Sequence, residues 1–285
     1  MTVGQLLTKA YLKLKTAKIN NYQLDAEYLL SWVTKKSRAH LLAYGEQKTT
    51  KHQQIKYQKL INLRTKHWPL AYLTGHQEFF GLNFQVDNRV LIPRPETEQI
   101  VEKIIKEKTT TPTAIIDVGC GSGAIIISLA KNIKTNKISY YGLDISAPAL
   151  TVAKKNAKFH QVDKIIKFIK SDLLSSLSDQ TLNQYQQLII AANLPYLTNE
   201  QIKAEPSIKH EPRLAQLSGP DGLDHYRRLF DQVAQLNRKN ITLLIEINPD
   251  QKTAIIEMVK KHWPLLRPII SQDLNSCDRI VMIKL

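Results

Sequence analysis

The sequence predicts an α/β fold in which a mostly parallel, doubly wound sheet follows a small N-terminal helical bundle and a β-hairpin linker. Apolar residues recur at helical spacing up to residue 75 and then alternate over 76–92. After Pro112 they form short runs between helical stretches. Strands that alternate with helices form parallel sheets covered on both faces. We therefore expect a helical domain at 1–75, a hairpin linker at 76–92 and an α/β domain at 93–285.

Helical periodicity dominates the first segment. The first predicted helix repeats apolar residues at i, i+3 and i+4 spacing from Val3 to Leu14. The second and third helices should turn their apolar runs to the inner face; these runs are Leu24, Tyr28, Leu29 and Trp32, and Ile55, Leu60, Ile61 and Leu63. Turn residues separate the three runs, which indicates a small bundle.

Glycine and proline residues mark the boundaries of the remaining predicted elements. Gly81 divides an alternating apolar run into a hairpin, and the stretch Pro93-Arg94-Pro95 forces extended backbone before a helix that begins at Glu96. The predicted strands of the α/β domain are 114–118, 138–143, 165–169, 188–192, 242–247, 269–271 and 279–283. The predicted helices between the first three strands are 124–131 and 147–159.

Composition excludes several classes of protein. The chain has 285 residues, of which 43% are hydrophobic, so it can bury a large core and is not disordered. Cys120 and Cys277 are the two cysteines, which cannot form a disulfide framework, and no Cys/His cluster has zinc spacing. Met1 to Leu14 lacks an apolar signal region, and Asp117 interrupts the longest uncharged run. We expect a cytoplasmic protein without a metal or a membrane span.

Most of the excess positive charge lies in the first quarter of the chain. The net charge is +15, and residues 1–75 hold 13 basic and three acidic residues, a net +10. This segment could be a steering surface for an acidic protein or for RNA, or it could be an ordinary solvated surface rich in lysine. The scattered lysines lack interleaved aromatic residues, so a dedicated nucleic-acid site is not required.

A glycine-rich loop follows the first strand of the α/β domain and opens a helix. The loop comprises Gly119, Cys120, Gly121, Ser122 and Gly123, directly after Asp117-Val118. Glycines allow a tight turn and close approach of a ligand to the backbone. The spacing is not that of a P-loop, and by itself it would also be compatible with a dinucleotide site.

Acidic residues at successive strand ends favour S-adenosylmethionine as the ligand. Asp144 ends the second strand, where a carboxylate can accept hydrogen bonds from both ribose hydroxyls, although an NAD site uses a similar acid. Asp172 follows the third strand and can accept from an adenine amino group, with Leu173 as an apolar wall. Together with Asp117, three acids at three strand ends are hard to explain as turn caps alone.

The tetrapeptide Asn193-Leu194-Pro195-Tyr196 follows the fourth strand, where open α/β sheets bind ligands. A nitrogen on an sp² carbon, as in an amide or an adenine amine, is a poor nucleophile. The Asn193 side-chain oxygen and the backbone carbonyl of Leu194 can accept its two N–H bonds and fix it for methyl transfer. Tyr196 can stack on the planar group. An isolated Asn-x-Pro-Tyr could be a simple turn, but the loop and acids upstream argue against this.

These motifs resemble those of the peptide chain release factor N5-glutamine methyltransferases, which are class I S-adenosylmethionine enzymes. The resemblance covers nearly the whole chain and rests on the loop, Asp144, the tetrapeptide and three further stretches. These are residues 91–98 (Leu-Ile-Pro-Arg-Pro-Glu-Thr-Glu), 211–215 (Glu-Pro-Arg-Leu-Ala) and 69–75 (Pro-Leu-Ala-Tyr-Leu-Thr-Gly). The resemblance implies a Rossmann-like class I methyltransferase sheet and transfer of a methyl group to the glutamine of a Gly-Gly-Gln loop.

The resemblance also implies site residues and a partner. It puts the cofactor on residues 119–123, Asp144, Leu173 and Asn193, and the glutamine on residues 193–196, with Asn193, Pro195 and Tyr196 in catalysis. The partner is a bacterial class I release factor, which the helical front domain contacts. Leu194 stands where the family usually has proline, and Asn-Leu-Pro-Tyr is also typical of ribosomal RNA adenine dimethyltransferases. The alternatives are therefore an adenine-N6 methyltransferase acting on ribosomal RNA or DNA, and an RNA-binding module.

Overall fold

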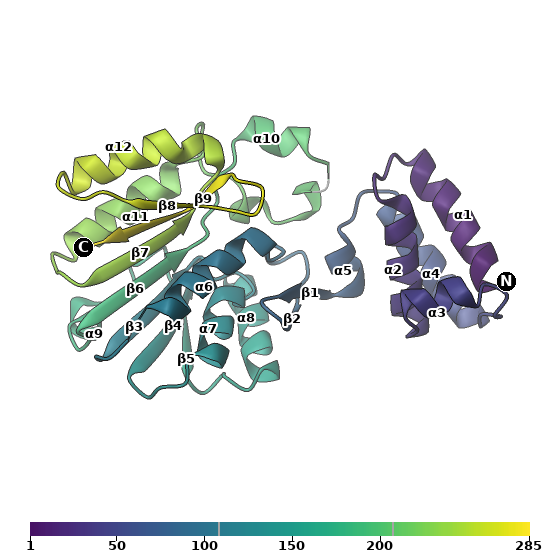
Figure 1. Ribbon diagram of the computed structural model, residues 1–285, viewed down its shortest axis with the longest axis horizontal. Coiled ribbons are helices and arrows are strands. Elements are labelled where there is room, and N and C mark those ends of the chain that lie inside the picture. The colour runs from purple at the N-terminus through teal and green to yellow at the C-terminus, as the bar shows by residue number, and fades with distance from the viewer. Residues whose placement is uncertain (108, 207) are drawn as a thin grey trace. The chain divides into compact units, whose positions relative to one another are not determined.

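The computed structural model describes residues 1–107, 109–206 and 208–285, and it divides into two compact units (Figure 1). The first unit comprises residues 1–76 together with 205–210, and the second comprises 77–204 and 211–285. The predicted hairpin thus belongs to the second unit from Gln77 onward, and a short segment late in the sequence joins the first.

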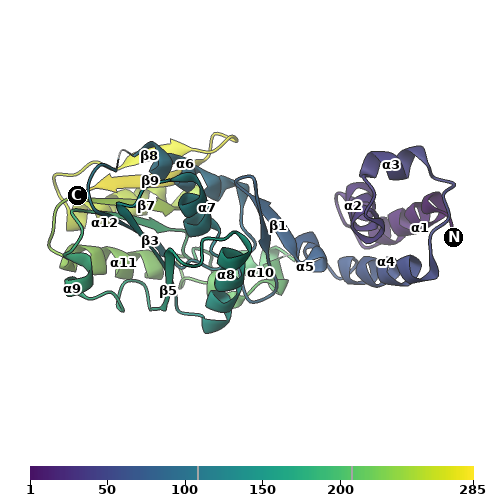
Figure 2. The same cartoon turned by 90° about the horizontal axis from the view of Figure 1, so that it is seen from below.

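The first unit is helical. Its helices, visible in Figure 2, are α1 (Val3–Thr16), α2 (Tyr22–Thr34), α3 (Arg38–Ala43), α4 (Lys51–Arg64) and α5 (Leu70–Thr74). The threonines at positions 2 and 50 begin α1 and α4 in capping boxes with a glutamine three residues later, which satisfies backbone N–H groups at both helix starts. A single apolar cluster contains residues from α1 to α5.

The inner face of α2 differs from the prediction. Leu24 and Tyr28 are 45% and 43% exposed, and Ile55 on α4 is 64% exposed, so the prediction that they face the core is wrong. Asp25 and Glu27 are buried instead. Each of these acids pairs with an arginine of the same unit, which offsets the cost of burying its charge. The spacing of apolar residues in the sequence could not reveal that ion-paired acids occupy part of the inner face.

The second unit begins with a two-stranded hairpin and continues as a seven-stranded α/β domain. The hairpin strands are β1 (His76–Phe79) and β2 (Leu82–Gln85). The strands of the large sheet are β3 (Thr113–Val118), β4 (Ile138–Asp144), β5 (Ile166–Lys170), β6 (Gln187–Ala192), β7 (Ile241–Glu246), β8 (Ile269–Gln272) and β9 (Asp278–Lys284). The α-helices are α6 (Glu98–Lys106), α7 (Ala124–Asn132), α8 (Ala147–Phe159), α9 (Asp179–Leu182), α10 (Asn199–Ala204), α11 (Asp224–Gln235) and α12 (Lys252–His262). Short 3₁₀ helices are η1 (Pro95–Thr97), η2 (Ile208–His210, in the first unit), η3 (Arg213–Ala215) and η4 (Pro249–Gln251).

The strand order of the large sheet is β5-β4-β3-β6-β7-β9-β8. Strands β3 to β7 run parallel, and β9 pairs antiparallel with both β7 and β8. The prediction of a mostly parallel sheet is therefore confirmed. Every residue of β3 is buried, including Thr113 and Asp117, which explains why its sequence is mostly apolar and does not alternate.

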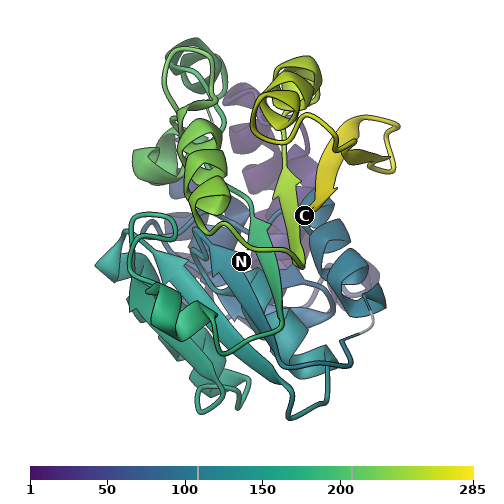
Figure 3. The same ribbon diagram turned by 90° about the vertical axis from the view of Figure 1, so that its left-hand side faces the viewer.

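Helices cover both faces of this sheet. Figure 3 looks along the strands and shows α11 and α12 together on one face. Apolar residues of β3, β6 and β7 pack against these two helices in the main core cluster. Helices α6, α7 and α8 form the other layer (Figure 1). Among the described residues, no helix combines the length and the apolar character that crossing a membrane requires.

The topology determines where a ligand can bind. The chain moves outward from the central strand β3 to β4 and β5, then returns to β6 on the other side of β3. A crevice opens outside the carboxyl ends of parallel strands where the winding direction reverses in this way. The glycine loop after β3 and the tetrapeptide after β6 flank that point.

Candidate active site

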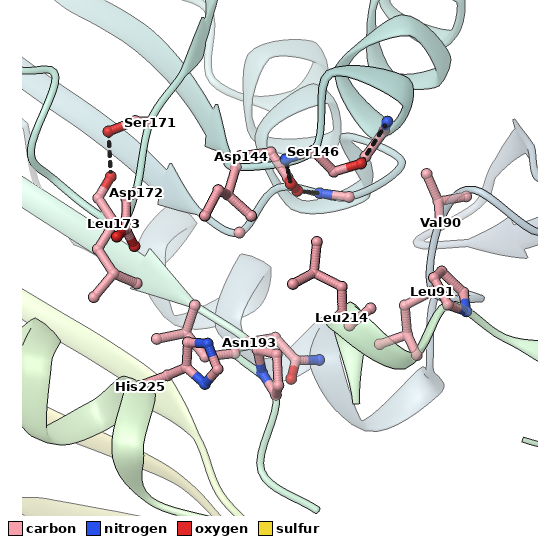
Figure 4. Close-up of a pocket in the computed structure, with 18 of the residues that line it drawn as sticks. Val90, Leu91, Asp144, Ser146, Ser171, Asp172, Leu173, Asn193, Leu214 and His225 are labelled. Carbon is pink, nitrogen blue, oxygen red and sulfur yellow. Dashed lines mark hydrogen bonds between the residues drawn. The ribbon is translucent and has the colours of Figure 1, made fainter. Parts of the chain in front are cut away.

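A pocket lies at the carboxyl ends of the parallel strands, within the second unit (Figure 4). It collects residues from the ends of β3, β4, β5 and β6, from the segments 89–91 and 212–215, and from the first turns of α11. The residues that line it are Arg89, Val90, Leu91, Gly119, Gly121, Asp144, Ile145, Ser146, Ala149, Ser171, Asp172, Leu173, Asn193, Leu194, Pro195, Pro212, Leu214, Ala215, His225 and Arg228. Eight of the twelve residues predicted from the sequence are among them.

The glycine loop requires glycine because its backbone is left-handed and closely packed. Gly119 has φ +75°, and a Cβ there would lie 3.0 Å from Leu194 Cδ2. Gly123 has φ +81°, and a Cβ there would lie 2.8 Å from the Ile127 side chain at the start of α7. Gly119 and Gly121 line the pocket, whereas Gly123 packs against α7 and α8.

Besides Gly123, two predicted loop residues do not line the pocket. Cys120 is buried against Leu150 and Ala153 of α8, and burial raises the pKa of its thiol well above the usual range, so it is inert. Ser122 is also buried, and its carbonyl accepts a hydrogen bond from the Asn156 side chain at 2.9 Å. These two residues hold the loop in place from behind.

Asp144 closes the carboxyl end of β4 next to the glycine loop. Its Oδ2 accepts from the Gly121 backbone N–H and its Oδ1 from the Ser146 N–H, both at 2.8 Å. Burial raises the pKa of the carboxyl group, while the two backbone donors lower it. Each carboxylate oxygen has more than one lone pair, so both can still accept from a ligand on the pocket side.

Asp172 and Leu173 form the wall after β5. Asp172 is paired with Arg228 of α11 at 2.5 Å, which engages one of its two oxygens. Leu173 has φ +54°, an unusual value for leucine, and the Ser171 hydroxyl supports the turn by donating to the Leu173 carbonyl at 2.7 Å. This turn directs the Leu173 side chain towards the pocket, as Figure 4 shows.

Asp117 does not share the site. It is buried in β3, where its Oδ2 accepts from the backbone N–H of Ile126 in the first turn of α7 at 3.3 Å. Burial raises the pKa of Asp117 to about 7. The acid before the first glycine therefore anchors a helix, and the capping role considered for it from the sequence is the one that the structure gives.

Asn193 follows β6 and is held by a chain of side-chain hydrogen bonds. Its Nδ2 donates to Thr97 Oγ1 at 2.9 Å, and the Thr97 hydroxyl donates to Glu246 Oε2 at 2.6 Å. Asn193 Oδ1 is buried without a hydrogen-bond partner among the described residues. A buried acceptor without a partner is uncommon, and it marks a position where a ligand donor fits.

The other tetrapeptide residues differ in position. Leu194 and Pro195 line the pocket, and Leu194 is also part of the main core cluster. Tyr196 does not line this pocket; its hydroxyl lies 3.5 Å from Glu246 Oε1, and its backbone carbonyl accepts from Gln251 Nε2 at 3.1 Å.

Several pocket residues were missed by sequence reasoning. Leu91 and Leu214 supply apolar walls from the two motif stretches 91–98 and 211–215, and Arg94 joins these stretches through an ion pair with Glu211 at 2.5 Å. His225, at the start of α11, was missed completely. Its Nδ1 lies 2.7 Å from the Ser218 hydroxyl oxygen, and burial, aided by the charge of Arg228, lowers its pKa.

Comparison with known proteins assigns the chain to a family. Residues 5–75 match the PrmC N-terminal domain and residues 110–262 match a methyltransferase domain. A release factor glutamine methyltransferase of Moorella thermoacetica is 36% identical over 262 residues, which cover 91% of this chain and 90% of that protein. One from Clostridium botulinum is 33% identical over 285 residues, covering 99% and 98%. This chain belongs to the release factor glutamine methyltransferase family.

Solved structures agree with the fold. The catalytic domain of human METTL16, in complex with an RNA hairpin, superposes with a TM-score of 0.56 at 16% identity, covering 82% of each chain. The N-terminal domain of human METTL16 in complex with SAH gives a TM-score of 0.51 at 15% identity, covering 90% of this chain and 93% of that one. At this identity the likeness shows the fold alone.

Proposed function

We propose that the protein transfers the methyl group of S-adenosylmethionine to the side-chain amide N5 of the glutamine in the Gly-Gly-Gln motif of a bacterial class I release factor. Membership of the release factor glutamine methyltransferase family supports this assignment. The observation that carries it at the site is the buried oxygen of Asn193 in the pocket wall, which has no hydrogen-bond partner within the part of the chain that the structure describes.

The residues at the strand ends fit S-adenosylmethionine. Asp144 presents two oxygens for the ribose hydroxyls. Gly119 and Gly121, which have positive φ, carry no side chain that could stand between the loop and the ligand. Leu173 and Leu214 provide apolar surfaces for an adenine ring. When bound, S-adenosylmethionine supplies an electrophilic methyl group on a positively charged sulfur.

The chain's contribution to chemistry is to orient the amide nitrogen. Asn193 Oδ1 accepts one N–H of the glutamine side chain, and the backbone carbonyl of Leu194, held extended by Pro195, accepts the other. Two acceptors aimed at the N–H bonds favour the pyramidal nitrogen that attacks a methyl group. The nitrogen becomes acidic only as the new bond forms, so no strong base is needed before transfer.

The first unit would dock the release factor. Residues 5–75 match the PrmC N-terminal domain, and this basic helical segment is separate from the residues that line the pocket. We infer that it binds the body of the factor, while the second unit acts on the glutamine. Translation termination takes place in the cytoplasm, so the enzyme would work there.

Adenine methylation is the alternative raised by Leu194, and the names of the close relatives do not favour it. One experiment separates the two. A bacterial lysate lacking the enzyme is incubated with purified protein and S-adenosylmethionine labelled in the methyl group. We expect label in one protein of release-factor size and none in RNA or DNA. Label confined to nucleic acid would overturn the proposal.

A further inference from the structure

A line of three side chains runs from the pocket wall into the core of the second unit. Asn193 follows β6 and Glu246 ends β7, and the pairing of Ala192 with Ile245 places them at neighbouring strand ends. Thr97, at the end of η1, lies between their side chains and bonds to both, at 2.9 and 2.6 Å. Thr97 and Glu246 are 4% and 1% exposed, so water does not compete for these bonds.

The chemistry of the three groups gives the line a direction. When Glu246 is ionised it accepts hydrogen bonds and donates none, so the Thr97 hydroxyl proton then points to Glu246. The remaining lone pairs of the hydroxyl oxygen then face a donor, which is the NH₂ group of Asn193. This leaves Asn193 Oδ1 on the opposite side of the amide, buried and without a partner among the described residues.

We propose that Thr97 and Glu246 are positioning residues that fix the side-chain amide of Asn193 so that its oxygen, and not its NH₂ group, is presented to the substrate. The inference rests on the proposed function, because a glutamine amide offers two N–H donors. If the Asn193 amide were turned by 180°, its NH₂ group would face the NH₂ group of the substrate glutamine, and two donors cannot form a hydrogen bond. The network removes that alternative before the substrate binds.

The surroundings of Glu246 set the balance between its ionised and its protonated form. Tyr196 directs its hydroxyl to Oε1 at 3.5 Å, and Tyr226 donates to the Glu246 backbone carbonyl. Burial raises the pKa of Glu246 to about 7, while the hydrogen bond from Thr97 and the positive charge of Arg279 lower it. Once protonated, Glu246 can donate to Thr97, and the hydroxyl of Thr97 is then free to donate to Asn193 Oδ1.

The first test compares Thr97→Val with Thr97→Ser. Valine keeps the shape but removes the hydroxyl, and we expect kcat for release-factor methylation to fall ~10- to 100-fold with unchanged affinity for S-adenosylmethionine. Serine restores the hydroxyl and should restore kcat. Thr242→Val, which removes a buried hydroxyl from β7 outside the network, is the matched control. If Thr97→Val and Thr97→Ser behave alike, or if Thr97→Val keeps the wild-type kcat, the inference is wrong.

The second test does not depend on activity. In protein labelled with ¹⁵N-asparagine, the Asn193 side-chain NH₂ signals are assigned by their absence in Asn193→Ala. We expect their hydrogen exchange to be slow in the wild type and in Thr97→Ser, and at least ~10-fold faster in Thr97→Val. Equal exchange in all three proteins would overturn the positioning role even if the enzyme methylates another substrate. If the Asn193 NH₂ group exchanges slowly in the wild type but the enzyme does not methylate the release factor, only the proposed function is refuted.

Discussion

The backbone N–H of Gly121 donates to Asp144 Oδ2 at 2.8 Å and so ties the glycine loop after β3 to the end of β4. One carboxylate thus shapes the loop and remains available to a ligand in the same pocket. This double role makes Asp144 the most sensitive position for testing the cofactor assignment.

Replacing Asp144 with alanine should weaken S-adenosylmethionine binding by about 2–4 kcal/mol, because two charge-assisted hydrogen bonds to the ribose are lost. Calorimetric titration measures the change. Asp163→Asn, an exposed change elsewhere in the second unit, is the control. Tight binding of NAD by the wild type, without binding of S-adenosylmethionine, would contradict the assignment.

Asn193→Ala should lower kcat by roughly 10²–10³ while leaving cofactor affinity nearly unchanged, because its oxygen acts on the reacting amide in the transition state. Single-turnover methylation of the factor and a cofactor titration separate the two effects. Asn183→Ala, at the exposed end of α9, should match the wild type. Normal turnover by Asn193→Ala would mean that the tetrapeptide is only a turn.

Leu194→Pro should retain methylation of the release factor, since proline presents the same backbone carbonyl. Leu194 is 3% exposed and belongs to the main core cluster, so loss of its side chain should lower the free energy of unfolding by about 1–3 kcal/mol. Denaturant titration and kcat are measured on the same preparation. Folded Leu194→Pro protein that no longer methylates the factor would make Leu194 a specificity determinant.

The buried carboxyl of Asp117 predicts a pH-dependent stability. Burial raises its pKa from 3.8 to about 7, so the folded state holds a proton that the unfolded state releases. Stability from this group is complete below the unfolded pKa and is lost as the pH rises through about 7. Between pH 5 and pH 8, wild-type stability should fall by about 3 kcal/mol more than that of Asp117→Asn. Denaturant titration at both pH values provides the comparison, with Asp163→Asn as control, and parallel profiles of wild type and Asp117→Asn would refute it.

Charge reversal should test docking by the first unit. Lys51, Lys59 and Lys66 line a shallow groove along α4 with the exposed Ile55. Changing the three lysines to glutamate should lower kcat/KM for the intact factor by ~10-fold or more at low salt, and by less at high salt, through slower association. The same triple change at the exposed Lys15, Lys36 and Lys48, outside the groove, should have a smaller effect. Equal losses from both triple variants would indicate that net charge, and not this groove, meets the factor.

The fold could be predicted because each strand of the large sheet carries its own signal. Mostly apolar runs marked β3 and β6, and the glycine loop after β3 and Asn193 after β6 marked the ligand side of the sheet. The inner face of α2 could not be predicted in this way. Its buried Asp25 depends on Arg64, which is 39 positions away in the chain.

The site was partly predictable for a similar reason. Gly119, Asp144 and Asn193 follow strands directly, so their position in sequence fixes their position at the sheet edge. Leu214 reaches the pocket from the long connection after β6, and His225 reaches it from the first turn of α11, which follows that connection. Their positions depend on tertiary contacts that local pattern does not encode.

The most direct measurement of the central claim is tandem mass spectrometry of a purified class I release factor after incubation with the enzyme and S-adenosylmethionine. Two factors are compared, one with the natural Gly-Gly-Gln motif and one in which that glutamine is alanine. We predict one added methyl group per molecule, placed by fragmentation on the glutamine side chain, and no addition to the alanine variant. A methyl group elsewhere on the factor, equal methylation of both factors, or none on either would contradict the account.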